Sequence, residues 1–283
     1  MGTGRYGSKH TSALPKGVNS RTPQQNLRVR ARSTGYELKM ADSTARKYRD
    51  SFNAYLDELE KFQNAMKLTP DMVNAAGGTI SVKSLDYYTL GNTNSDGEIN
   101  LNSKRMSPTD KSMLDTLPHE HTHNLVHTLI TKELGFAKGS VEYHKAYYDA
   151  AIEHSINQAA LENYKRYMSN YYDKQIKGFK DTLKNSDNDT IKEMSRQFIR
   201  DTRKQKAELN TITIEQASKN SGMRDYALRQ YPWAPSGHYI EMPTVAAENF
   251  VSSGHSYRKL LQDSPYSYFV LQNLYSRLHK KKK

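Results

Sequence analysis

The segment His119-Glu120-His121-Thr122-His123 places two histidines four residues apart, with a glutamate directly after the first. Residues i and i+4 lie on one face of an α-helix, so the imidazoles of His119 and His123 can converge on one metal ion. Zinc prefers nitrogen ligands in a tetrahedral shell, and in catalytic sites it leaves the fourth position to water, whose pKa it lowers to about 7. Glu120 would take the proton from that water. The HExxH pattern therefore predicts a catalytic zinc site on a helix.

The residues around the motif support a helix. Ser107 and Pro108 resemble a helix start, with Ser107 as the N-cap and Pro108 in the first turn. Pro118 removes one backbone hydrogen bond and clashes with the carbonyl four residues earlier, so we expect a kink or a new start there. Apolar residues then continue to Gly135, a typical C-terminal stop.

The third metal ligand is open at this level. The metzincin pattern HExxHxxGxxH is excluded, because it requires glycine and histidine where this chain has Val126 and Leu129. A thermolysin-like site needs a glutamate roughly 20 residues beyond the second histidine, and Glu142 is near that spacing, with Glu153 behind it. The remaining candidate is Glu248, in a short apolar segment with a helical pattern.

Downstream of the motif, the stretch Ser236–Tyr239 reads SGHY and the stretch Ala247–Phe250 reads AENF. This arrangement resembles the pattern "GH, then Tyr, then A-E-x-F-A" that follows HExxH in the metallopeptidase domains of phage minor head proteins of the Mu F type. Similar E-F-F-A-E segments supply the last zinc ligand in lethal-factor-like toxins. The resemblance covers roughly residues 79 to 275. It rests on three short segments: the strands before the motif, the motif itself, and the segment from Gly237 to Phe250.

The resemblance implies a gluzincin in which Glu248 joins His119 and His123 as the third ligand of Zn²⁺. It also implies that Tyr239, with His238 as the alternative, donates a hydrogen bond to the oxyanion of the tetrahedral intermediate. The implied fold is α+β. It consists of a zincin-like metallopeptidase core, with a small mixed sheet, an edge strand and the HExxH helix, and of a largely helical insert.

The residues before the motif are expected to form the sheet. Thr79–Val82 and Tyr87–Leu90 are rich in strand-forming residues, and Asp96-Gly97 is a turn before Glu98–Asn102. In zincins an edge strand at this position pairs with an extended substrate through backbone hydrogen bonds. A plain edge hairpin is the alternative.

Charge and periodicity divide the chain into three parts. Residues 1–40 are expected to form a basic disordered arm, because the stretch up to Arg32 contains Lys and Arg but no acid. The resemblance implies that residues 41–278 form the metallopeptidase domain, with a helical insert at about 155–225, and residues 279–283 are expected to form a basic tail. Helical patterns cover Ala41–Lys67, Val141–Lys184, Thr190–Leu209, Thr213–Ser218 and Tyr266–Leu278.

The composition narrows the setting in which the protein acts. An apolar content of 36% and a mean hydropathy of -0.88 indicate a modest core with long polar helices. The chain has no cysteine and no apolar run of signal-peptide or membrane-span length, so we expect no disulfides, no membrane contact, and maturation in a cytoplasm. The resemblance implies, more narrowly, a location in a virion or a bacterial host cytoplasm. The net charge of +12 predicts non-specific nucleic-acid binding through the basic arms as an accessory property.

Two classes of function follow. The first is a zinc-dependent endopeptidase acting on a protein or peptide substrate, in which Glu120 activates water and later protonates the leaving amine. The resemblance implies that such an enzyme is phage-encoded, as a virion-associated protease or a toxin-like effector. The alternative is a structural minor head protein that contacts capsid or portal proteins and DNA. The presence of Glu120 favours catalysis, since a scaffold does not need a base.

Overall fold

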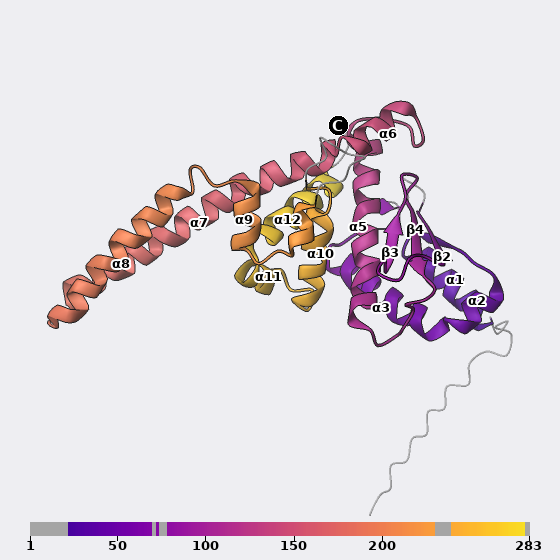
Figure 1. The fold of residues 1–283 in the computed structure, drawn as a ribbon, viewed down its shortest axis with the longest axis horizontal. Helices are drawn as coiled ribbons and strands as arrows, with labels where there is room; N and C mark the ends of the chain where they lie inside the picture. Colours follow the sequence, from indigo (N-terminus) through magenta and orange to yellow (C-terminus); the bar gives the residue numbers. More distant parts are fainter. Residues whose placement is uncertain (1–21, 70–71, 74–77, 230–238, 281–283) are drawn as a thin grey trace, which may run out of the picture.

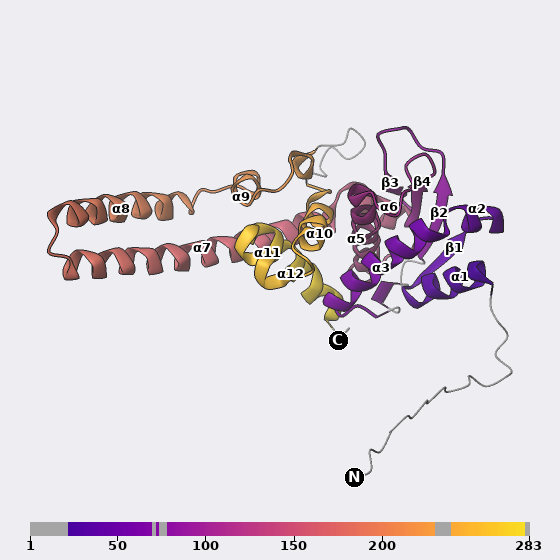
Figure 2. The same cartoon turned by 90° about the horizontal axis from the view of Figure 1, so that it is seen from below.

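The computed structural model describes residues 22–69, 72–73, 78–229 and 239–280. They form an α+β fold, as the sequence predicts, in which one small sheet lies among many helices (Figures 1 and 2). The strands of the described chain are β1 (Tyr36–Lys39), β2 (Gly78–Lys83), β3 (Gly91–Thr93) and β4 (Glu98–Asn102), in the order β1-β2-β4-β3. The pairs β1/β2 and β2/β4 are parallel, whereas β3 lies antiparallel to β4 at the edge of the sheet.

Two of the three predicted strands are confirmed by β2 and β4, whose Ile80, Ile99 and Leu101 are buried in the core. The strand predicted at Tyr87–Leu90 is wrong. That stretch is a loop, because the carboxylate of Asp86 accepts hydrogen bonds from the backbone N–H groups that follow it. The edge strand is β3, directly after this loop.

Helix α5 (Lys111–Glu133), which carries the HExxH motif, occupies the centre of the fold. It packs against α3 (Arg49–Ala65) and β3 on one side and against α10 (Met242–Ser252) on another (Figure 1). Its side chains Leu117, Leu125 and Leu129 are completely buried. The motif is therefore held between the sheet and the C-terminal helices.

The start of α5 differs from the prediction. The N-cap is Asp110, not Ser107, and its carboxylate accepts a hydrogen bond from the N–H of Ser112 at 2.9 Å. The helix continues through Pro118, so no new start occurs there. The carbonyl of Pro118 also accepts a hydrogen bond from the hydroxyl of Thr122 at 2.9 Å.

The prediction of a disordered arm over residues 1–40 is wrong for residues 22–40, which form α1 (Pro23–Ser33) and β1. Leu27 and Ala31 on α1 are buried, and the guanidinium of Arg30 donates hydrogen bonds at 2.8 Å to Glu60 on α3. Two of the cations that suggested disorder, Arg28 and Arg30, thus have acidic partners elsewhere in the fold. The rest of the arm, residues 1–21, and the tail residues 281–283 lie outside the described residues.

Two of the predicted helices are each divided in two. Tyr48 separates the helix expected over residues 41–67, and Ala150, with a left-handed φ of 48°, separates the one expected over residues 141–184. The helix expected at the C-terminus is confirmed. The remaining helices are α2 (Asp42–Lys47), α6 (Val141–Tyr148), α7 (Ala151–Asn185), α8 (Asp189–Glu208), α9 (Ile214–Asn220), the 3₁₀ helix η1 (Asp225–Leu228), α11 (Tyr257–Asp263) and α12 (Pro265–His279).

The predicted helical insert corresponds to α7, α8 and α9. Helices α7 and α8 form an antiparallel hairpin that projects from the rest of the molecule (Figures 1 and 2). It begins at Ala151, slightly before the expected boundary. Among the described helices, none combines the length and the apolar character required to cross a membrane.

Candidate metal centre

The two motif histidines lie side by side on α5. Their ring centroids are 5.2 Å apart, and the side chains are 14% and 11% exposed for His119 and His123. Because α5 is continuous, the spacing of four residues brings both imidazoles to the same side of the helix. This part of the sequence-based prediction agrees with the structure.

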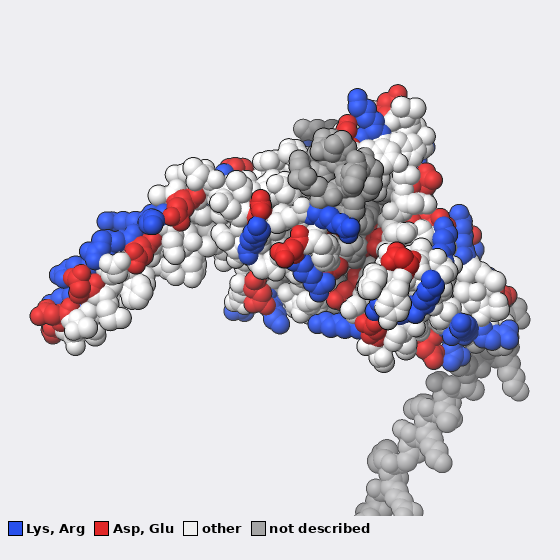
Figure 3. Space-filling model, viewed as in Figure 1, with Lys and Arg blue, Asp and Glu red and all other residues white. Residues whose placement is uncertain are grey.

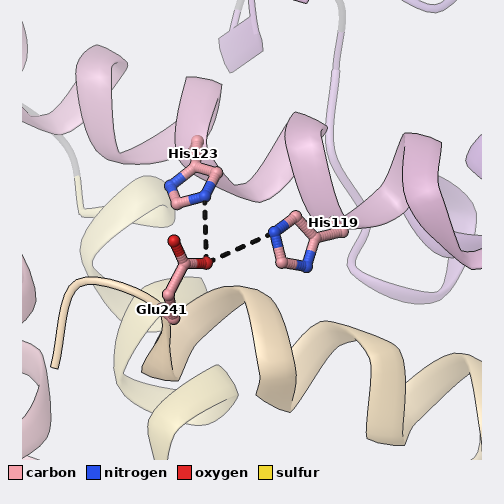
Figure 4. A group of neighbouring side chains, drawn as sticks. All are labelled: His119, His123 and Glu241. Carbon is pink, nitrogen blue, oxygen red and sulfur yellow. Dashed lines mark ion pairs between the residues drawn. The ribbon is translucent and has the colours of Figure 1, made fainter. Parts of the chain in front are cut away.

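A third side chain, Glu241, meets both imidazoles (Figure 4). Its Oε2 atom lies 3.3 Å from Nε2 of His119 and 3.3 Å from Nε2 of His123. Glu241 is the N-cap residue of α10, is 8% exposed, and accepts a hydrogen bond from the hydroxyl of Thr244 at 3.1 Å. One ligand atom from each of the three residues lies within 4.8 Å of the other two, so this group can hold a metal ion.

The separations in this group fit a small tetrahedral site. Zinc binds histidine nitrogen and carboxylate oxygen at about 2.0–2.2 Å, so two ligand atoms of a tetrahedral shell are about 3.3–3.5 Å apart. Both distances from Glu241 Oε2 to the histidine nitrogens are 3.3 Å. The donor set, two imidazoles and one carboxylate, is also one that catalytic zinc sites use, with the fourth position left to water.

Glu248, the ligand implied by the family resemblance, lies on the other edge of the His119 ring. Its Oε1 atom is 2.8 Å from Nδ1 of His119, and its Oε2 atom accepts a hydrogen bond from Arg224 at 2.8 Å. With Nε2 of His119 directed at Glu241, a Glu248 carboxylate at Nδ1 fixes the ring orientation and the tautomer. The structure therefore groups Glu241, and not Glu248, with the two Nε2 atoms.

The charges of these groups are strongly coupled. Burial alone would lower the pKa of His119, but Glu241 and Glu248 outweigh it and raise that pKa well above its ordinary value. Burial would likewise raise the pKa of Glu241, whereas His123 and His119 lower it well below the usual carboxyl range. A metal ion must displace protons from these imidazoles, so binding at this group is coupled to proton release.

Glu120 is held beside the group by the sheet. Its Oε2 atom accepts a hydrogen bond from the hydroxyl of Thr93 on β3 at 2.8 Å, and its Oε1 atom is 4.0 Å from Nε2 of His119. Glu120 is 5% exposed. The carboxylate thus lies on the Nε2 side of His119, where a base acting on a water molecule near the metal position is required.

The candidate centre opens into a cleft of about 590 Å³. One wall is the loop and strand from Tyr88 to Thr93, and the other contains Arg224 and Tyr226 from the region of η1. The Tyr226 ring centroid is 6.3 Å from that of His119. Burial and the neighbouring Glu248 raise the pKa of the Tyr226 phenol, so it remains a hydrogen-bond donor at neutral pH.

Other residues predicted for the site lie elsewhere. Tyr239 is not among the described residues that line the cleft, and its carbonyl accepts a hydrogen bond from Asn157 at 3.3 Å. His238 lies outside the described residues. Glu142 is exposed on α6, and Glu153 is buried on α7 but is not part of the group of potential ligands.

One feature of the sequence relates Glu241 to Glu248, although it does not show which of the two meets both histidines. Glu241 and Glu248 are seven residues apart, which is two helical turns, so a helix that directs one of them at α5 also directs the other. Both side chains contact His119, at Nε2 and Nδ1 respectively. Tyr226 and Arg224 follow no comparable pattern and were missed for that reason.

Glu153 gives the protein a predicted pH dependence of its stability. Neither of its carboxylate oxygens has a hydrogen-bond partner in the described chain, and burial raises its pKa from 4.5 to about 7. A carboxyl group whose pKa is higher in the folded protein than in the unfolded chain contributes stability. This contribution is fully present below the ordinary pKa of 4.5, and it is lost as the pH rises through about 7. The shift corresponds to about 3 kcal/mol.

We expect Glu153→Gln to remove this loss of stability at high pH. The melting temperature of the variant should exceed that of the wild type at pH 8, and the two melting temperatures should differ little at pH 5. Thermal unfolding across this range measures the effect. Glu142→Gln, which changes an exposed carboxylate on the neighbouring helix, is the matched control. Identical pH profiles for Glu153→Gln and the wild type would contradict the assignment.

These features define an α+β protein with a largely buried group of two histidines and one carboxylate, which can hold a metal ion and lines a cleft. Comparison with known proteins adds no family: no family model, no curated protein and no solved structure matches the chain.

Proposed function

We propose that this chain is a zinc-dependent endopeptidase with a zincin-like core. The observation that carries the proposal is the position of Glu241 Oε2, at 3.3 Å from Nε2 of both histidines of an HExxH helix. The resemblance to the metallopeptidase domains of phage minor head proteins supports the same class. It also supports a phage origin and a protein substrate.

In this proposal His119, His123 and Glu241 hold the zinc ion. When bound, zinc supplies a Lewis acid that polarises the substrate carbonyl and lowers the pKa of water. The Glu248 carboxylate accepts the Nδ1 proton of His119, so that Nε2 is the nitrogen available to the metal. Arg224 holds Glu248 in place from its other oxygen.

Glu120 is the general base and acid. Its carboxylate accepts a proton from the attacking water and later delivers that proton to the leaving amine. The hydroxyl of Thr93 orients the carboxylate for both transfers. The phenol of Tyr226 donates to Glu248 in this structure and lines the cleft beside His119. We assign this phenol to the oxyanion, to which its single proton would move its hydrogen bond as negative charge develops there.

Strand β3 is the proposed docking edge for the substrate backbone. The bonds from Asn102 N to Leu90 O and from Asn94 N to Glu98 O pair residues 90 and 94 with β4. In an antiparallel pair the bonding direction alternates, so the peptide groups of Gly91 and Thr93 face away from β4. An extended peptide would add to this edge by β-augmentation.

Gly91 brings this strand close to the active helix. A Cβ at this position would lie 2.8 Å from the Thr116 methyl and 3.3 Å from Cγ of Glu120. The absence of a side chain therefore allows the edge strand to approach the proposed base.

The test is a joint measurement of metal content and hydrolysis on the full chain. We expect close to one zinc per chain after dialysis, and cleavage of unfolded casein that a chelator stops and added zinc restores. His123→Ala should lose both properties. His154→Ala, an exposed histidine on α7, is the matched control and should retain them.

The outcomes separate the two classes of function. Zinc binding without hydrolysis of any protein or peptide tested would contradict the endopeptidase and favour a structural head protein with a retained metal site. Wild-type protein without bound metal would contradict the centre itself.

A further inference from the structure

The hairpin of α7 and α8 has no role in the proposed catalytic cleft. It extends away from the part of the molecule that contains α5 and the sheet (Figures 1 and 2). Helix α8 packs along α7 through buried Ser195, Ile199 and Thr202. The outer sides of both helices are therefore open to solvent.

The hairpin has two unlike sides. Ile191, Met194 and Phe198 on α8 are exposed and share one side, where Phe198 stacks on Phe179 of α7 with ring centroids 5.0 Å apart. Lys and Arg gather along another side, with acidic residues interspersed and concentrated towards the tip (Figure 3). The charged side therefore presents an excess of positive charge along the hairpin.

A hollow of about 530 Å³ lies between the two helices near the base of the hairpin. Its lining includes Lys165 and Arg166 from α7, Arg203 and Lys206 from α8, and one acid, Glu162. Two antiparallel helices thus bring four cations into one concave surface. A concave surface with charges of one sign concentrates the electrostatic potential.

The cations of this hollow are only partly neutralised. Lys165 lies 3.3 Å from Glu162, and Lys206 donates hydrogen bonds to both carboxylate oxygens of Asp173 at 2.6 Å. No ion pair within the described chain engages Arg166 or Arg203, and both are exposed. Their guanidinium groups are therefore available to an anion, and a planar guanidinium matches a phosphate through two parallel hydrogen bonds.

The row of arginines on α8 extends the site beyond one phosphate. Arg196, Arg200 and Arg203 are spaced at i, i+4 and i+7, so they share a side of the helix and cover about 10 Å of its length. A nucleic-acid strand carries a phosphate every 3.4 Å or so along its axis, so about three phosphate steps cover that distance. Arg196 and Arg200 contact Glu193 in exposed ion pairs, which are worth little and can exchange for phosphate.

We propose that the charged side of the α7–α8 hairpin binds the phosphate backbone of a nucleic acid without reading its sequence. Arg166 and Arg203 are the anchoring contacts, and the arginines along α8 follow the strand. This site is distinct from the basic terminal segments and does not depend on the proposed peptidase activity.

The experiment measures binding of a fluorescently labelled 30-base-pair DNA of random sequence to the full chain by anisotropy, at several salt concentrations. We expect Arg166→Gln/Arg203→Gln to weaken binding by about tenfold or more at 0.1 M salt. The slope of the logarithm of the binding constant against the logarithm of the salt concentration should also become less steep by about two, because two phosphate contacts are lost. Both residues are exposed and glutamine is a good helix former, so circular dichroism and the melting temperature should be unchanged.

The control is Arg258→Gln/Lys259→Gln, which removes the same charge from exposed positions on α11. Binding close to that of the wild type in this control, with loss in the hairpin variant, supports the site. Equal loss in both variants, or no binding by the wild type, overturns it. Competition by inorganic phosphate alone at equal phosphate concentration would show a single-anion site and would also overturn the backbone assignment.

Discussion

Glu120→Gln is expected to reduce the rate of peptide hydrolysis by orders of magnitude while the protein still binds zinc. The carboxylate is not one of the three side chains whose atoms meet at Glu241 Oε2, so its loss leaves the metal group intact. Glutamine has nearly the same shape and can still accept the hydrogen bond from Thr93, but it cannot take a proton from water. General acid–base catalysis contributes on the order of 10²–10⁴-fold, and we expect kcat to decrease by that factor.

The measurement pairs kcat on a quenched fluorescent peptide with zinc content from elemental analysis. Glu142→Gln changes a carboxylate of the same type on the exposed face of α6 and should leave both values unchanged. Hydrolysis at the wild-type rate by Glu120→Gln would assign the base elsewhere. Loss of zinc together with activity would show instead that Glu120 supports the metal group.

Glu241→Ala is expected to weaken zinc binding far more than Glu248→Gln does. Glu241 supplies the oxygen that lies at 3.3 Å from Nε2 of both His119 and His123, whereas Glu248 contacts only the opposite nitrogen of His119. Replacing a residue that orients a ligand typically costs 10–100-fold in metal affinity. We therefore expect a loss of about 10–100-fold for Glu248→Gln and a greater one for Glu241→Ala.

Competition for zinc with a chromophoric chelator gives both affinities in one experiment. Glutamine at position 248 retains an oxygen that can accept the Nδ1 proton of His119, so this variant isolates the charge of the orienting carboxylate. The reverse order of affinities would restore Glu248 as the third ligand, as the family resemblance implies. It would also show that Glu241 serves only to pair with the protonated histidines.

Glu241 and Glu248 show which part of the candidate site could be predicted from the sequence. The residue in the AENF segment does belong to the centre, but on the Nδ1 side of His119. The residue that meets both Nε2 atoms stands at the start of the same helix, before a proline at its second position. The pattern of residue types indicated helix α10. The packing of α10 against α5 determined which of the two carboxylates contacts which histidine nitrogen.

In the sheet, too, some elements could be predicted from the sequence and others could not. Strands β2 and β4 follow from runs of strand-forming residues, and both were predicted. The stretch Tyr87–Leu90 has equally favourable composition, yet Asp86 bonds the backbone that follows it and the chain turns there. The prediction of disorder for residues 22–40 is wrong for a related reason, since the acids that neutralise Arg30 come from a distant helix.

The sequence by itself determined strands β2 and β4, the helical position of His119 and His123, and the placement of Glu120 beside them. These features depend on residue spacing within one helix or strand, and such spacing is fixed by backbone geometry. Only the tertiary structure decided that Glu241 completes the group and that Thr93 orients Glu120. It also decided that Tyr226 lines the cleft. Glu241 is 118 residues from His123 along the chain, and contacts over such separations arise from the packing of whole helices, which no local pattern encodes.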